Sequence, residues 1–315
     1  MKKTTISRWC VSIFLPFVLW GCSPNESQVK EDGKPQVVAT STIIADLTQE
    51  VGGEEINLTG ILQPGTDPHV YEPVPADSVV LEKADLILYN GYNLEPGIIK
   101  LMNAAGKKAQ KVAVGEVVKP LKLEKSKGEV VPDPHVWGSV ENAILMVNAI
   151  KQALIELSPE DKDQFTKNAD QLTQELQQLH TWIKQQIATI PADKRKLITT
   201  HDAFQYYTNT YGLEVAGTLI GISTEEQPSA QTFKQLVDVI KKMGVPTIFA
   251  ETTINPALIT AIAEDAEVKL SDNQLYSDSI GAKGSSGETY MKMMAANTRA
   301  VVEGLGGKYT PFKPQ

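Results

Sequence analysis

The chain has 315 residues, with 42% hydrophobic and 22% charged side chains, and it carries 38 acidic against 30 basic groups. The resulting net charge of −8 excludes a typical nucleic-acid-binding protein, because nucleic acids attract basic surfaces. A chain of this length is longer than most domains with a single hydrophobic core, which indicates two domains.

The first 21 residues are typical of an export signal. Three basic residues precede an apolar run from Trp9 to Trp20, which is too short to span a bilayer as a mature helix. The run ends in LWGC, where a small residue precedes Cys22 as in bacterial lipoprotein signals. We therefore expect residues 1–21 to be removed, Cys22 to be acylated, and the mature protein to be anchored to a membrane on its extracytoplasmic side. The alternative is ordinary secretion with Cys22 free.

Residues 22–35 are polar, contain Pro24, Gly33 and Pro35, and show no apolar period, so they predict a flexible tether. Loss of residues 1–21 changes the charge balance to 27 basic against 38 acidic groups, a net charge of −11. It also removes Cys10. With Cys22 lipidated, the mature chain can form neither a disulfide nor a thiolate metal site.

From residue 36 onward, short β-branched runs alternate with helical patterns. This alternation predicts parallel βαβ units with right-handed crossovers, and we assign residues 36–157 to an N-terminal βα lobe. The strands are expected at 36–40, 56–62, 85–90 and 111–114, and the helices at 41–52, 76–84 and 139–157.

A long helix is expected next, in the linking segment 158–191. Ser158 and Pro159 suit its first turn, and neither Gly nor Pro occurs again before Pro191. Thirty-odd helical residues would span roughly 45 Å, enough to cross from one domain to another.

Beyond this helix the alternation resumes, and we assign residues 192–315 to a C-terminal βα lobe. The expected strands are 196–200, 214–220, 246–251 and 267–271, with a helix at 229–244. The predicted fold class is therefore α/β: two βα lobes with parallel sheets, joined by one long helix.

The sequence DPHV occurs twice, at 67–70 and 133–136. Each copy places a rigid Pro before a His, which fixes the backbone around one imidazole. Either copy alone could be a chance turn capped by its His. The two copies together favour a shared site.

Three histidines and one aspartate follow predicted strands. Ligands of open parallel sheets bind beyond the carboxyl ends of the strands, so these side chains are candidates for one site in the cleft between the lobes. Three neutral imidazoles and a carboxylate suit a divalent first-row metal such as zinc. The four predicted ligands are His69, His135, His201 and Asp278.

Other readings remain open for several residues. His201 could simply pack at a helix start, and Asp278 could be a turn residue, with Asp272 or Glu251 as the ligand instead. His180, inside the long helix, is interpreted as a solvated residue. Carboxylates that could orient the imidazoles from behind are Glu251, Asp67, Asp133 and Asp202.

The chain contains, in this order, the lipoprotein signal, GTDPHVYEP, DPHVW, THDAFQYY, AETTINP and LYSDSIG. With this ordered set of features, it resembles the zinc/manganese solute-binding lipoproteins of bacterial ABC importers, the cluster A-I or TroA-like family. The resemblance covers essentially the whole mature chain. It implies that one Zn²⁺ or Mn²⁺ per chain is held in the cleft by His69, His135, His201 and Asp278. It also implies delivery of that ion to a permease with its ATPase, and we expect the protein to be a monomer.

The metal is not fixed by the resemblance. His at the THDAF position resembles the zinc-binding and mixed members, whereas manganese-preferring members often have Glu there. Dedicated zinc members tend to carry a His-rich loop ahead of the second ligand, and the stretch KPLKLEKSKGEVVP contains no His.

A different class of function is a secreted zinc-dependent hydrolase, with three His ligands, a bound water and Glu251 as the general base. The sequence contains no HExxH motif. A surface adhesin with the same lipid anchor is a third possibility.

Overall fold

The computed structural model describes residues 33–124 and 130–314. The predicted signal peptide, Cys22 and most of the predicted tether lie outside these residues. From Lys34 onward, the described residues form one compact unit. In the described part of the chain, no helix is both long and apolar enough to cross a membrane.

The N-terminal half, residues 36–157, is built on a four-stranded parallel sheet with strand order β2-β1-β3-β4. Its strands are β1 (Gln36–Ala39), β2 (Asn57–Gly60), β3 (Leu86–Tyr89) and β4 (Gln110–Ala113). Its helices are α1 (Thr42–Gly52), α2 (Pro75–Lys83), α3 (Pro96–Ala104) and α4 (Val140–Leu157). An antiparallel hairpin of β5 (Lys122–Glu124) and β6 (Val130–Pro132) follows β4, and a 3₁₀ turn, η1 (Val136–Gly138), precedes α4.

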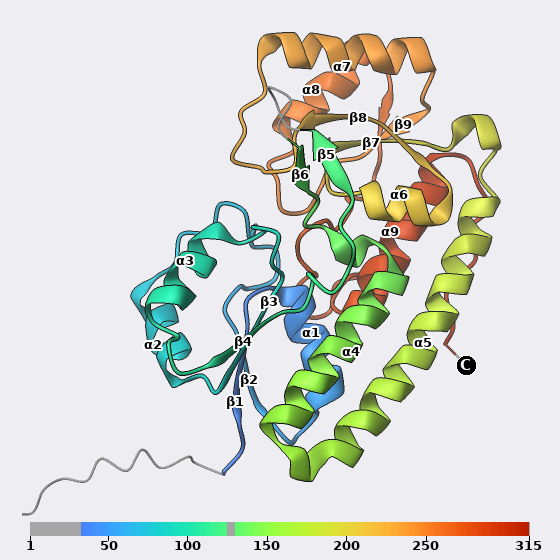
Figure 1. Ribbon diagram of the computed structural model, residues 1–315. Coiled ribbons are helices and arrows are strands. Elements are labelled where there is room, and N and C mark those ends of the chain that lie inside the picture. The colour runs from blue at the N-terminus through green and yellow to red at the C-terminus, as the bar shows by residue number, and fades with distance from the viewer. Residues whose placement is uncertain (1–32, 125–129, 315) are drawn as a thin grey trace, which may run out of the picture. The chain divides into compact units, whose positions relative to one another are not determined.

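Helices cover both faces of this sheet (Figure 1). Alternate strand residues point to opposite faces, so Val37 packs toward α1 and α4 while Val38 packs toward α2 and α3. Burial on both faces explains the continuous apolar run of β3, which reads LILY.

The C-terminal half, residues 192–314, repeats this arrangement. Its strands are β7 (Lys196–His201), β8 (Glu214–Ile220), β9 (Thr247–Ile248) and β10 (Lys269–Leu270). β7 pairs with β8 and β9 with β10, both in parallel, and the Phe249 amide donates to the Ile198 carbonyl at 3.0 Å to join the two pairs. The order β8-β7-β9-β10 thus matches that of the first sheet. Its helices are α6 (Gln205–Tyr211), α7 (Ala230–Met243), α8 (Ala257–Ala266) and α9 (Tyr290–Gly304), with a 3₁₀ turn, η3 (Ala192–Lys194), before β7.

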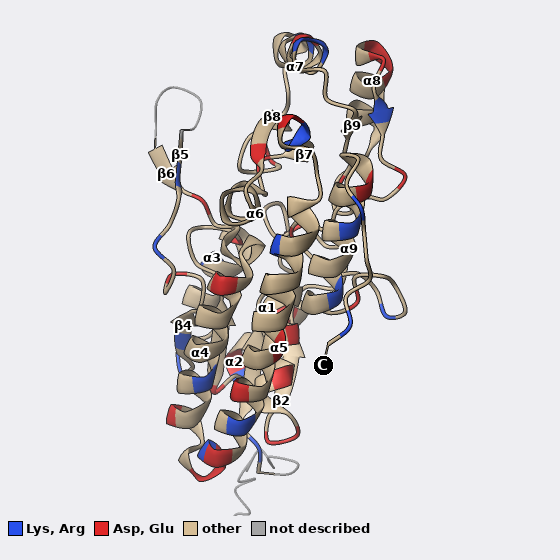
Figure 2. Ribbon diagram, turned by 90° about the vertical axis from the view of Figure 1, so that its right-hand side faces the viewer, with Lys and Arg blue, Asp and Glu red and all other residues tan. Residues whose placement is uncertain are grey.

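The predicted long helix is present as a short 3₁₀ turn, η2 (Pro159–Asp161), followed by α5 (Lys162–Ala188). Its buried apolar residues recur every three or four positions and pack on α4, α1 and α9. They are Phe165, Ala169, Leu172, Leu176, Leu179, Ile183 and Ile187. The outer faces of α4 and α5 carry charges of both signs (Figure 2), and Lys151 of α4 reaches Asp170 of α5 at 3.8 Å.

The last described residues lie along α5. Gln186 donates to the Thr310 hydroxyl at 2.9 Å and accepts from the Thr310 amide at 2.8 Å, and the Trp182 indole donates to the Thr310 carbonyl. The Trp182 ring also contacts Tyr309 and Phe312. This terminal segment therefore holds the C-terminal end of α5.

One large hydrophobic cluster passes through α1, α4, α5, α6 and α9, while a second lies under α7 and α8 and a third under α2 and α3. The structure confirms the predicted α/β class, with parallel sheets before and after one long helix. The lobe limits at 36–157, 158–191 and 192–315 remain a prediction, because the central cluster includes residues of both halves.

Candidate metal centre

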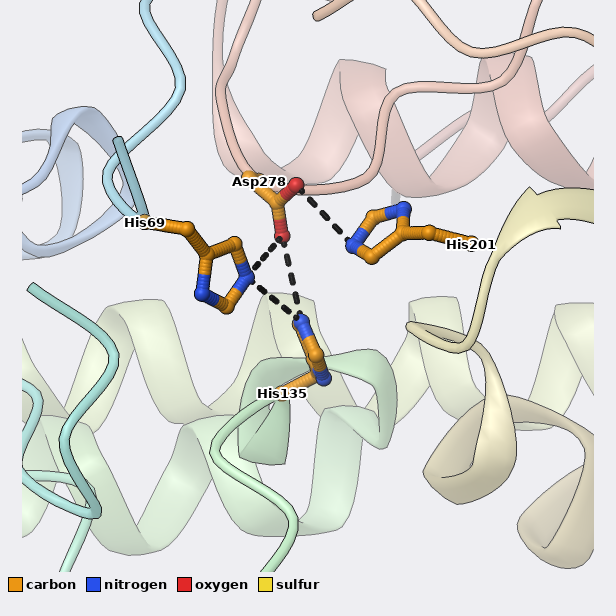
Figure 3. Close-up of side chains that lie close together, drawn as sticks. All are labelled: His69, His135, His201 and Asp278. Atoms are coloured by element: carbon orange, nitrogen blue, oxygen red, sulfur yellow. Dashed lines mark hydrogen bonds and ion pairs between the residues drawn. The ribbon is translucent and has the colours of Figure 1, made fainter. Parts of the chain in front are cut away.

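The structure brings together the four residues that the sequence predicts as ligands (Figure 3). His69 lies in the loop between β2 and α2, His135 directly precedes η1, His201 ends β7, and Asp278 lies between β10 and α9. All four are buried, with exposed fractions of 4%, 0%, 0% and 1% respectively. Two chain segments from each half of the protein thus meet at one buried point.

The spacing of the ligand atoms fits one metal ion. The Nε2 atoms of His69 and His135 are 3.2 Å apart, and the Asp278 carboxylate lies 3.4 Å from His135 Nε2 and 3.2 Å from His201 Nε2. His69 Nε2 is 4.0 Å from the same carboxylate. A tetrahedral zinc site with bonds near 2.0–2.1 Å has ligand–ligand separations of about 3.3 Å. Small adjustments of side chains would therefore complete such a site.

The repeated DPHV motif has the same local geometry in both copies. The Asp67 carboxylate accepts from the His69 amide at 2.9 Å, and the Asp133 carboxylate accepts from the His135 amide at 3.0 Å. Each is an Asx turn, in which an aspartate bonds the backbone two residues on and the intervening proline fixes φ. Two copies of one turn therefore aim two imidazoles.

Two buried carboxylates set the orientation of two imidazoles. Asp133 Oδ1 lies 2.7 Å from His135 Nδ1, and Glu251 Oε2 lies 2.5 Å from His201 Nδ1. Glu251 also accepts from the His201 amide at 2.8 Å through Oε1. A proton on each Nδ1 satisfies these carboxylates and leaves the Nε2 lone pair directed at the centre. Asp133 and Glu251 therefore occupy the positions expected for orienting residues.

The electrostatics of the centre favour a cation. Burial lowers the pKa of His201, but the carboxylates of Glu251 and Asp278 outweigh burial and hold that pKa well above its usual range. Burial also raises the pKa of Asp278, but the three imidazoles outweigh it and hold that pKa below its usual range. His201 Nε2 and Asp278 Oδ1 are buried and lie 3.2 Å from the Asp278 carboxylate and 3.4 Å from His135 Nε2 respectively, but neither atom makes a hydrogen bond of good geometry. Buried polar atoms are normally paired, so these two are the atoms that an ion would satisfy.

The Asp278 segment is also fastened to the N-terminal half. The Trp137 indole donates to the Ser277 carbonyl at 2.9 Å, and the Ile280 amide donates to the Thr42 hydroxyl at 3.1 Å. Ser279 accepts from the Gly65 amide at 2.8 Å. The sequence did not predict these contacts. The one feature that could have indicated them is the aromatic residue of DPHVW, Trp137, which makes the first of them.

The remaining candidates lie outside the four-residue cluster. Asp202 accepts from Gln205 at 2.8 Å at the start of α6, and Asp272 is exposed and pairs with Lys269. His180 is half-buried in α5, with its Nδ1 3.4 Å from the Tyr211 hydroxyl. This geometry favours Asp278 over Asp272 as the carboxylate ligand.

Comparison with known proteins identifies the family. Residues 37–304 match the ZnuA family, described as zinc-uptake complex component A, periplasmic, and the chain belongs to this family. The manganese-binding lipoprotein MntA of Bacillus subtilis (strain 168) is 34% identical over 297 residues, covering 93% of this chain and 97% of the relative. The manganese ABC transporter substrate-binding lipoprotein PsaA of Streptococcus pneumoniae is 34% identical over 311 residues, covering 97% and 99%. The solved structure of the periplasmic zinc-binding protein TroA from Treponema pallidum superposes with a TM-score of 0.82 at 33% identity, covering 87% of this chain and 99% of that one.

Proposed function

We propose that the protein captures one Zn²⁺ or Mn²⁺ outside the cytoplasm and delivers it to an ABC-type importer, with His69, His135, His201 and Asp278 as the ligands. The observation that carries this proposal is the convergence of four buried ligand atoms within 4.8 Å of one another. The buried Nε2 of His201 and Oδ1 of Asp278, which lack a well-formed hydrogen bond, support it.

The relatives agree on the class of cargo and differ on the metal. MntA and PsaA are named for manganese, and TroA for zinc. Affinity for divalent ions at a nitrogen-rich site rises from Mn²⁺ to Zn²⁺, so three imidazoles should bind zinc more tightly in vitro. Availability in the cell can still make manganese the cargo.

The class of binding protein indicates the partners with which this protein works. A substrate-binding protein of an ABC transporter hands its cargo to a permease that works with an ATPase, and the relatives carry the word lipoprotein in their names. We propose that Cys22, which lies outside the described residues, carries the lipid anchor, and that the protein acts as a monomer.

The hydrolase alternative has no support in the geometry. Both oxygens of Glu251 are bonded to His201, through its amide and its Nδ1, so this carboxylate is not free to act as a general base. Asp278 supplies the fourth ligand and so takes the position that a catalytic water would need. The family consists of solute-binding proteins.

Calorimetry on the metal-stripped mature protein tests the proposal. We expect one Zn²⁺ or Mn²⁺ per chain, and we expect His69→Ala and His201→Ala to abolish high-affinity binding. His180→Ala, a histidine outside the cluster, is the matched control and should bind like the wild type. Unchanged affinity in both ligand variants would refute the assignment of the site.

A further inference from the structure

A cavity of about 540 Å³ reaches the metal centre from one side. Of the four proposed ligands, all of which the structure describes, His69 lines this cavity and the other three do not. One wall comes from the N-terminal half, including Tyr92 and Glu116. The opposite wall is the β8–α7 loop (221–229), which contributes Ile222, Ser223, Glu225 and Glu226. His69 is thus the ligand closest to a route by which an ion can enter.

The carboxylate of Asp67 joins the two walls. Its Oδ1 accepts from the His69 amide at 2.9 Å, and its Oδ2 accepts from the Thr224 hydroxyl at 2.6 Å. Thr224 lies in the β8–α7 loop, 157 positions away in the sequence. One side chain therefore fixes the backbone of a ligand and, at the same time, holds the loop that covers it.

The β8–α7 loop depends on few regular contacts. It contains neither helix nor strand, its residues are mostly half-buried or exposed, and Ile222 is its buried side chain. Its own backbone closes one turn, in which the Glu226 amide donates to the Ser223 carbonyl at 3.2 Å. A loop of this kind belongs to the part of a fold that opens at low free-energy cost.

By contrast, the segments behind the other ligands are fixed by several buried bonds. Asn90 donates to the Pro134 carbonyl at 2.9 Å and Tyr206 to the Asp133 carbonyl at 3.0 Å, next to His135. His201 is held at both its amide and its Nδ1 by Glu251. The side of the centre that can open with the fewest broken contacts is therefore the His69 side.

We propose that the Thr224–Asp67 hydrogen bond is a latch, with Asp67 as a positioning residue, and that the ion enters and leaves past His69 when this latch opens. The proposal rests on the proposed function, since it assigns a route to the same metal centre. The bond uses neither Nε2 of His69 nor the Asp278 carboxylate, so it does not compete with an ion for these ligand atoms.

A latch of this kind controls rates more than affinity. Loss of the Thr224 hydroxyl should raise the association and dissociation rate constants for Zn²⁺ together, by about ten- to a hundredfold for a hydrogen bond to a charged group. The equilibrium Kd should then change by less than either rate constant. A contact that merely stabilises the loaded protein would raise the dissociation rate alone.

Stopped-flow measurements on the full mature protein test this proposal, with Zn²⁺ binding followed directly and release followed during a chelator chase. Thr224→Val and Thr224→Ala remove the hydroxyl, and Thr224→Ser retains it as the matched control. We expect both rate constants to rise in the first two variants and to stay near wild type in the third. The absorption spectrum of bound Co²⁺ should be the same in all four proteins, because the ligands are intact.

Two results would overturn the latch: unchanged rate constants in Thr224→Val and Thr224→Ala, or a rise in the dissociation rate alone. In both cases binding of one ion per chain would leave the proposed function standing. A wild-type protein that binds no Zn²⁺ would instead refute the proposed function, and the latch with it.

Discussion

The Glu251 carboxylate is engaged entirely with His201, as it accepts from both the amide and the ring Nδ1. Replacing it by the isosteric amide in Glu251→Gln retains one acceptor but removes the charge that stabilises the Nδ1–H tautomer. Loss of such an orienting partner typically lowers metal affinity by about ten- to a hundredfold. We therefore expect calorimetry of Glu251→Gln to show weaker binding at an unchanged stoichiometry of one ion.

Asp202→Asn is the matched control for this variant. Asp202 is the next residue after His201, yet its carboxylate accepts from Gln205 at the start of α6. Its affinity should stay close to that of the wild type. Equal losses in both variants would mean that general negative charge, rather than the orientation of the imidazole, determines binding.

Glu95 is a second buried carboxylate, and it makes stability depend on pH. One of its oxygens accepts from the Asn90 amide at 2.7 Å and from the Thr40 hydroxyl at 2.8 Å, while the other has no partner. Burial raises the pKa of Glu95 from 4.5 to about 7. The folded state therefore binds this proton more tightly than the unfolded state, so the contribution is full below pH 4.5 and is lost as the pH rises through about 7.

Glu95→Gln isolates this contribution, because glutamine does not ionise. The free energy of unfolding of the wild type, relative to that of the variant, should fall by about 3 kcal/mol between pH 4.5 and pH 7.5. Denaturant titrations at several pH values measure this difference, and the contributions of the other carboxylates, which both proteins share, cancel in it. A difference that does not vary with pH would show that Glu95 ionises in the fold as it does in water.

Among the elements, α5 has the clearest energetic role, since its buried stripe joins the helices of both halves. Leu176 is fully buried in that stripe, so Leu176→Ala should destabilise the fold by about 2–5 kcal/mol through lost burial and the cavity left behind. Chemical denaturation measures the change. Gln177→Ala, on the exposed face of the same turn, should stay within about 0.5 kcal/mol of wild type. A similar loss in both variants would contradict the packing described for α5.

At the same scale, sequence periodicity predicted most of the strands and the long helix. The expected strand 214–220 matches β8, and α1, α4 and α7 begin within one residue of the expected positions. The expected strand 246–251 is reduced to Thr247–Ile248, because the chain then turns to place Glu251 in an isolated bridge with Leu275. Helices α3, α6, α8 and α9 were not assigned from the sequence.

The site was predictable to the extent that it follows strand ends and local motifs. The strand map selected His69, His135, His201 and Asp278, and the structure brings them together. Contacts between distant residues of ordinary type were not predictable. Two examples are the hydrogen bond between Thr224 and Asp67 and the one between Thr42 and the Asp278 segment. No local sequence pattern marks either contact, because each depends on how two loops that are remote in the sequence meet.

For the whole molecule, an ion held by four segments from both halves should stabilise the fold by mass action. Free Zn²⁺ at a hundred times its Kd adds about 2.7 kcal/mol if the unfolded chain does not bind it. For a mature chain of about 280 residues, that free energy raises the melting temperature by about 5 °C. Calorimetric scans with Zn²⁺ and with a chelator should show this shift in the wild type and not in His201→Ala. An equal shift in both proteins would place the stabilising ion elsewhere.

The positions of two tryptophans, Trp137 and Trp182, allow the protein's own fluorescence to report on two different places in the structure. The chain has four tryptophans, and two of them, Trp9 and Trp20, belong to the predicted export signal. The other two occupy distinct places: Trp137 donates to the carbonyl of Ser277, beside the proposed ligand Asp278, and Trp182 lies under the terminal segment that ends near Phe312. In the mature protein without the predicted export signal, a Trp182→Phe variant would keep Trp137 as its one tryptophan, so emission excited selectively at tryptophan would report on the proposed metal centre, and loading of the ion could be followed in real time without any added dye.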